Sequence, residues 1–198
     1  MKRDPATKEA TVGKVVVTEF ISLDGVIEAP GDPTEYERGG WATGGGQEGM
    51  KFKFDELMAS DAQLLGRITY EGFAKAWPTM EGTGEFGEKM NEMPKFVVST
   101  TLRDPQWNNT TVLNGDLGTD VDELTKRFNG DVLVAGSGKL VQALLELDLV
   151  DELRLMVFPI VLGKGKRLFG ETSEKKQLAL VDSKTLDGGV IILSYARA

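Results

Sequence analysis

The chain has 198 residues, a length typical of a single domain, and its 40% hydrophobic and 27% charged content is ordinary for a globular protein. It contains no cysteine and no histidine, which excludes disulfides, thiolate or imidazole metal sites and histidine-dependent hydrolases, so no metal site is expected. A net charge of -8 argues against general nucleic-acid binding. No apolar run reaches the roughly 20 residues that span a bilayer, and the polar N-terminus lacks a signal-peptide core, so a cytoplasmic, non-membrane protein is expected.

In chain order, residues 1–13 are polar and expected to be disordered, which leaves 14–198 as the domain. Residues 14–25 form a β-branched run that predicts a buried strand. Residues 29–49 are rich in glycine, lack periodicity and are much longer than a usual connection, so a functional loop is expected there.

The middle of the chain alternates predicted helices and strands, and its last fifty residues predict strands without helices. Helices are expected over 50–60, 68–77, 86–93, 119–128 (with Thr119 as N-cap) and 138–147, and strands over 62–66, 95–100, 131–136, 151–163, 176–186 and 189–198. This pattern predicts an α/β domain with parallel strands, an antiparallel C-terminal edge and helices on both faces. Ligands of such sheets bind outside the carboxyl ends of the strands.

Three predicted strand ends combine small residues, hydroxyls and a cation, which together suit an anionic ligand such as a phosphate. The first comprises Gly66, Arg67 and Thr69, the second Ser99, Thr100, Thr101 and Arg103, and the third Gly136, Ser137, Gly138 and Lys139. Each also has an ordinary structural explanation as a turn, a helix cap or a solvated cation. Three together favour a dinucleotide, although the glycine spacing is not the G-x-G-x-x-G of Rossmann folds.

Several segments resemble the dihydrofolate reductase-like family, in the branch that contains the reductase domain of the riboflavin biosynthesis deaminase-reductase. They are "ISLDGVI", "GRITYE", "VVSTTL", "VAGSGKLVQALL" and "DELRLMVFPIVLGKGKRLF", and the resemblance extends over residues 14–197. It implies a three-layer α/β/α fold around a mixed, mostly parallel eight-stranded sheet with antiparallel C-terminal strands. It also implies NADPH as the hydride donor.

The resemblance implies a role for each of the three junctions. The cofactor phosphates would contact Gly66, Arg67 and Thr69, the pyrophosphate would lie on residues 136–139, and the adenosine 2′-phosphate would contact Ser99, Thr100 and Arg103. The nicotinamide would lie against Phe20 and Ile27, and the loop over 29–49 would be a mobile lid.

The substrate half of the site departs from the family. The acid that dihydrofolate reductases carry on their first helix falls near Met50 here, with Glu48 and Asp55 close by. Val134 stands where the riboflavin-pathway reductases usually have a substrate-contacting Glu, and residues 48–65 lack the arginines that those enzymes use. No catalytic residue or proton donor is assigned from the sequence.

Two further residues are candidate substrate contacts. Asp24 could orient a substrate or simply form an Asp-Gly turn, and Trp41 could stack on a planar substrate or anchor its loop. Lys164, Lys166 and Arg167 could bind a substrate phosphate, but their interpretation as solvated hairpin cations is favoured.

The expected protein is thus a homodimeric, NADPH-dependent oxidoreductase that reduces a small heterocyclic substrate. The activity it resembles is reduction of 5-amino-6-(5-phosphoribosylamino)uracil in riboflavin biosynthesis. The alternative is a non-catalytic nucleotide-binding or assembly module that keeps the fold.

Overall fold

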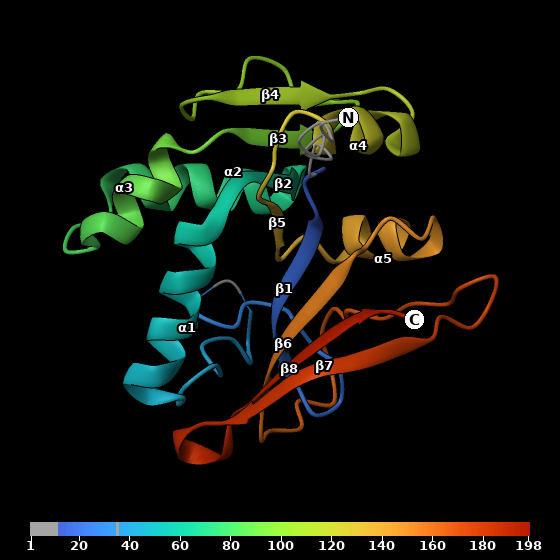
Figure 1. Ribbon diagram of the computed structural model, residues 1–198. Helices are drawn as coiled ribbons and strands as arrows, with labels where there is room; N and C mark the ends of the chain where they lie inside the picture. Colours follow the sequence, from blue (N-terminus) through green and yellow to red (C-terminus); the bar gives the residue numbers. More distant parts are fainter. Residues whose placement is uncertain (1–11, 35) are drawn as a thin grey trace, which may run out of the picture.

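The computed structural model describes residues 12–34 and 36–198 (Figure 1). Most of the expected disordered segment, residues 1–11, lies outside the described residues. Gly13 is buried, and its N–H donates a hydrogen bond of 3.0 Å to the Thr125 carbonyl. The elements are β1 (Val15–Ser22), α1 (Gly46–Ala59), β2 (Ser60–Gly66), α2 (Arg67–Ala76), the 3-10 turn η1 (Trp77–Thr79), α3 (Gly84–Glu92), β3 (Lys95–Val98), β4 (Thr110–Leu113), α4 (Leu117–Thr125), β5 (Asp131–Ala135), α5 (Gly138–Glu146), β6 (Glu152–Phe158), β7 (Leu178–Thr185), the 3-10 turn η2 (Asp187–Gly189) and β8 (Ile191–Arg197).

The strands form one eight-stranded sheet in the order β4-β3-β2-β5-β1-β6-β8-β7. The first six strands of this order are parallel, whereas β8 runs antiparallel to β6 and β7 antiparallel to β8. The predicted mixed sheet with an antiparallel C-terminal edge is therefore confirmed.

Helices cover both faces of the sheet and make three layers (Figure 1). Val16 of β1 packs in one cluster with residues of α1, α2 and α3, whereas Val15 and Val17 pack in another with residues of α4 and α5. Successive side chains of a strand point to opposite faces, so a central strand buried on both sides needs the unbroken apolar run that β1 begins with.

Some predicted boundaries were wrong for local reasons. Helix α1 begins at Gly46, four residues before Met50, after Gly45 in a left-handed conformation. The N-cap of α4 is Asp116 and not Thr119, because the Asp116 carboxylate accepts from the Thr119 N–H at 3.0 Å and from its hydroxyl at 2.9 Å. The short edge strand β4 was missed, and the strand expected over 151–163 ends at Phe158, before Pro159.

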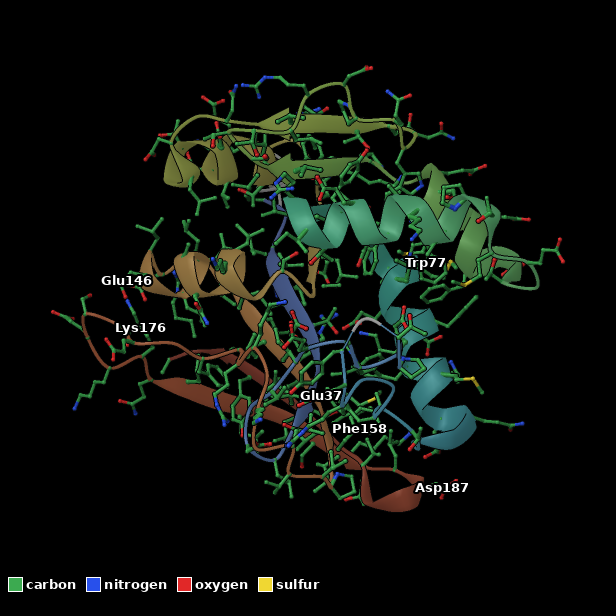
Figure 2. The ribbon with its side chains drawn as sticks, turned by 180° about the vertical axis from the view of Figure 1, so that it is seen from behind. Glu37, Trp77, Glu146, Phe158, Lys176 and Asp187 are labelled. Atoms are coloured by element: carbon green, nitrogen blue, oxygen red, sulfur yellow. The ribbon has the colours of Figure 1, made fainter. Side chains whose placement is uncertain are left out.

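The long loop between β1 and α1 packs on the far end of β6. A third cluster there includes Trp41, Met156 and Phe158. The Trp41 and Phe20 rings each meet Phe158 edge to face with centroids 5.6 Å apart, and Figure 2 labels Phe158 within this region. Over the part of the chain that the structure describes, no helix is long and apolar enough to cross a membrane.

Candidate nucleotide site at the carboxyl ends of β1 and β5

The sheet opens at the carboxyl ends of β1 and β5. These strands pair only as far as Thr18 opposite Ala135, whereas β1 continues to Ser22 and stays paired with β6 on its other side. The chain leaves β1 through α1 on one face of the sheet and leaves β5 through α5 on the other (Figure 1). Such a reversal of direction between neighbouring strands creates a crevice that commonly holds a ligand in α/β proteins.

Two helices begin side by side at this crevice. The Gly66 N–H, at the start of α2, donates to the Ser137 hydroxyl at 2.9 Å, and the Ser137 N–H, at the start of α5, donates to the Thr69 hydroxyl at 2.9 Å. Neither helix has a side-chain cap on its first turn. Free N–H groups of two helix starts therefore lie close together, an arrangement that attracts anions.

The turn that joins β5 to α5 has two consecutive left-handed residues, Gly136 and Ser137, each with φ of 59°. A Cβ at Gly136 would lie only 3.1 Å from the Thr69 Cγ2, and a Cβ at Gly138 would lie 2.9 Å from the Ile27 Cδ1. The glycines thus allow a close approach of three segments that are far apart in the sequence. Predicted site residues from the first and third junctions, together with Ile27, are brought to one place.

The cations of these junctions lie on the surface. Arg67 is bound by Glu71 one turn further along α2, with 2.8 Å between Nη1 and Oε1. Lys139 is exposed at the first turn of α5. Both cations lie at helix starts, where they add positive charge to the free amides.

The second junction is a self-capped turn after β3. The Ser99 hydroxyl accepts from the N–H groups of Thr101 at 3.1 Å and of Leu102 at 2.9 Å, so it is used within its own loop. The Thr100 side chain is exposed, and the Arg103 guanidinium donates to the neighbouring Leu102 carbonyl. This junction follows β3, the second strand from β5 in the sheet.

The Asp24 side chain has a structural role. Its carboxylate accepts from the N–H groups of Leu162 at 3.0 Å and Gly163 at 2.8 Å, and from the Ser22 hydroxyl at 2.7 Å. The Leu162 amide and the Ser22 hydroxyl hold the pKa of this carboxyl well below its usual range. Asp24 therefore tethers the loop after β6 to the end of β1.

Trp41 likewise anchors its loop. The side chain is 7% exposed, and its indole N–H donates to the Glu28 carbonyl at 2.8 Å. With its ring against Phe158, it offers no free face for stacking on a planar substrate. Of the two explanations left open for this residue, the structure supports the anchor.

The buried acid of α1 is Glu56, which sequence reasoning missed. The expected neighbours are exposed: Glu48 pairs with Lys184 and Asp55 with Lys51. The Glu56 carboxylate instead accepts from the Thr18 hydroxyl at 2.9 Å and pairs with Lys53. The Arg154 guanidinium lies 3.5 Å from its other oxygen, so Glu56 belongs to a buried network of charges.

Glu19 is the second residue that sequence reasoning missed. It is only 5% exposed and lies on β1 just beyond the last pair with β5. Its Oε1 is buried without a hydrogen-bond partner. Burial raises the pKa of the Glu19 carboxyl well above its usual range, and Lys53 and a hydrogen bond from the Gly136 N–H offset this only in part. The signal in the sequence was an acid inside a run that reads as a buried strand.

The chain is similar in sequence to known proteins. The chain is 26% identical over 185 residues to each of two Bacillus subtilis (strain 168) proteins, the uncharacterized proteins YyaP and YwjB. The alignments cover 92% and 93% of this chain and 94% and 98% of those proteins.

Solved structures share the fold. A candidate riboflavin biosynthesis protein of Shewanella sp. PV-4 superposes with a TM-score of 0.74 at 22% identity, over 93% of this chain and 99% of that one. RibD of Acinetobacter baumannii gives 0.66 at 19% identity, over 95% of this chain and 58% of its own length. Dihydrofolate reductase of Enterococcus faecalis, complexed with NADP(H), gives 0.60 at 16% identity, over 93% and 96%.

At these identities, the structural matches establish a dihydrofolate reductase-like fold, as expected from the sequence. The family model of the RibD C-terminal domain matches residues 13–192, which is most of the chain. The chain therefore belongs to the RibD C-terminal domain family.

Proposed function

We propose that the chain is an NADPH-dependent reductase that passes hydride to a C=N or C=O carbon of a small heterocyclic molecule. The observation that carries this proposal is the pair of uncapped helix starts, α2 and α5, joined by the hydrogen bonds between Gly66, Ser137 and Thr69. They lie at the crevice between β1 and β5, where the fold favours a ligand.

The residues present fit a dinucleotide. Gly136 and Gly138 let Thr69 and Ile27 pack against the turn that begins α5, and Lys139 and Arg67 add positive charge beside the free amides. Thr100 and Arg103 are exposed and could reach a 2′-phosphate, while Ile27 would lie against the cofactor. The bound NADPH would supply the hydride, and the chain would position the reactants and exclude water.

A non-catalytic nucleotide-binding module remains the competing function, and a specific observation favours it. Val134 is fully buried where the family's reductases usually have a substrate-contacting Glu, and the exposed Glu48 and Asp55 of α1 do not replace it. The module would bind the dinucleotide without turnover.

Calorimetric titration with NADPH and with NADH tests the cofactor assignment. We expect NADPH to bind more tightly, because a phosphate held by hydroxyl and guanidinium groups gains charge-assisted hydrogen bonds worth about 1.5–3 kcal/mol each. Equal affinity for the two dinucleotides would contradict the role of the second junction. Lack of binding by either would defeat the proposed function.

Loss of NADPH absorbance, followed with a panel of small heterocyclic C=N and C=O compounds, separates the enzyme from the binding module. The panel should include 5-amino-6-(5-phosphoribosylamino)uracil, the substrate of the activity that the family suggests. Tight NADPH binding without oxidation of NADPH by any compound would support the module.

A further inference from the structure

Glu19 and Glu56 are the buried acids of the described part of the chain, and they differ in their partners. Glu56 accepts from the Thr18 hydroxyl and pairs with Lys53 and Arg154. The Oε1 atoms of both acids are buried without a hydrogen-bond partner, but Glu19, unlike Glu56, has no ion pair within the described residues. A buried carboxyl without an ion-pair partner destabilises a fold and tends to hold its proton, so it is more readily explained by function than by packing.

The position of Glu19 connects it to the proposed nucleotide site. It follows Thr18, the last residue of β1 that pairs with β5, so it lies where the two strands begin to separate. The Gly136 N–H, which lowers the pKa of the Glu19 carboxyl, belongs to the turn on which the dinucleotide phosphates would lie. A phosphate and an ionised Glu19 would therefore compete for the same amide and repel each other.

The surroundings of Glu19 favour its neutral form when an anion is bound. The charged groups that act on it come from α1, where Lys53 favours the carboxylate and Glu56 opposes it. Lys53 is itself paired with Glu56. From β6 its register partner is the apolar Leu155, and from the β5–α5 turn it meets a backbone amide. A dinucleotide would add negative charge without adding a cation.

We propose that Glu19 is the proton donor of this site, protonated while a dinucleotide is bound; this inference rests on the proposed reductase function. The acceptor carbon takes hydride from NADPH, and its nitrogen or oxygen takes the proton of the Glu19 carboxyl. The C=N or C=O bond becomes CH–NH or CH–OH, NADP⁺ leaves, and the Glu19 carboxylate regains a proton from solvent. No histidine or cysteine is present to do this instead.

Proton uptake on cofactor binding tests the idea without a substrate. NADPH is titrated calorimetrically at several pH values from 6 to 9, in buffers of different ionisation enthalpy. We expect the wild-type protein to take up more protons than Glu19→Gln, by up to one proton at a pH between the pKa of Glu19 in the free protein and its pKa in the complex. The background is low because the chain has no histidine or cysteine. Equal proton counts in the two proteins would overturn the proposal.

Turnover gives the second test, using whichever compound of the panel is reduced. Glu19→Gln should lower kcat about 100-fold or more, as loss of a general acid does. Wild-type activity should fall as pH rises through the pKa of Glu19, because the donor must be protonated, and Glu19→Asp should keep that pH dependence at a lower rate. An unchanged rate and pH profile in Glu19→Gln would defeat the proton-donor role alone, whereas absence of NADPH binding in the wild type would defeat the reductase function as well.

Melting temperatures show whether the variants are folded. The raised pKa means that folded Glu19 holds its proton while the unfolded chain releases it, so wild-type stability falls as pH rises from about 4 through the folded pKa. At neutral pH Glu19→Gln should therefore melt about 2–4 °C higher than the wild type, and the gain should vanish below about pH 4. The matched variant Glu56→Gln should melt lower at neutral pH, because it leaves Lys53 and Arg154 without their buried partner.

Discussion

At the scale of single residues, the β5–α5 turn shows why glycine occurs where it does. A side chain at Gly136 would combine a left-handed backbone with a Cβ 3.1 Å from Thr69. A substitution at Gly136 would therefore change the stability of the fold more than the affinity for a ligand. The exposed Lys139 on the first turn of α5 is a better probe of the phosphate site.

Lys139→Glu should separate binding from folding. An acid in the first turn of a helix is favoured by the helix dipole, so we expect unchanged or slightly higher stability, by about 0.3–1 kcal/mol at low salt. Reversing the charge beside the bound phosphates should weaken NADPH binding about tenfold, or about 1.4 kcal/mol. Melting curves and NADPH titrations measure the two effects.

Lys175→Glu is the matched control, because it makes the same change of charge at an exposed position near the other end of α5. Its neighbour Lys176 donates to the Glu146 carbonyl at the end of that helix, and Figure 2 labels these two residues beside each other. NADPH affinity should be unchanged in this variant. Equal loss of affinity in both variants would indicate a general charge effect and would contradict a phosphate site at the start of α5.

At the scale of elements, the loop from β1 to α1 is held at both sides of Trp41. The Gly40 N–H donates to the Ala29 carbonyl and the Ala42 N–H to the Pro30 carbonyl, each at 2.9 Å. Together with the buried Trp41, these bonds hold the segment around Trp41 against residues 29 and 30. A lid formed by the whole loop, as expected from its glycine content, would have to break them.

Hydrogen exchange distinguishes an anchored loop from a lid. The Gly40 and Ala42 amides should exchange slowly in the ligand-free protein, and Trp41→Ala should accelerate their exchange at least tenfold by removing the packing that holds them. Thr43→Ala, an exposed neighbour, should leave their exchange unchanged. Protection of these amides only after NADPH is added would show instead that the loop is a lid.

At the scale of the whole molecule, the two edges of the sheet differ. Strand β4 has four residues, whereas β7 has eight, nearly all exposed, including the apolar Leu180 and Val181 (Figure 1). A long exposed edge strand with apolar side chains tends to be covered by a partner. We therefore place the proposed homodimer interface on the late strands.

Light scattering at micromolar concentration should give twice the chain mass of 21.6 kDa. Val181→Asp should yield a monomer, because it puts a charge into the apolar part of the interface. Thr111→Asp, at an exposed position of the opposite edge strand β4, should leave the dimer intact. A monomeric mass for the wild type would exclude the dimer.

Most of the fold was predictable because its determinants are local. The apolar runs of β1, β5 and β6, and the helices between the strands, appear directly as periodicity, and they imply parallel pairing and layers on both faces. Errors occurred where local signals are weak, as in the short strand β4, or where a cap could be assigned to either of two residues, as at Asp116 and Thr119.

The sequence by itself determined the α/β class, the family and the three glycine- and hydroxyl-rich junctions, since each depends on residues close together in the chain. Only the tertiary structure decided what these residues contact. Ser137 and Thr69 are 68 positions apart, yet their hydrogen bond joins two helix starts. The side chains of Asp24 and Trp41 form hydrogen bonds that hold loops in place. Glu19 acquires its character in the same way: burial raises the pKa of its carboxyl, and that burial arises from long-range packing that sequence spacing does not encode.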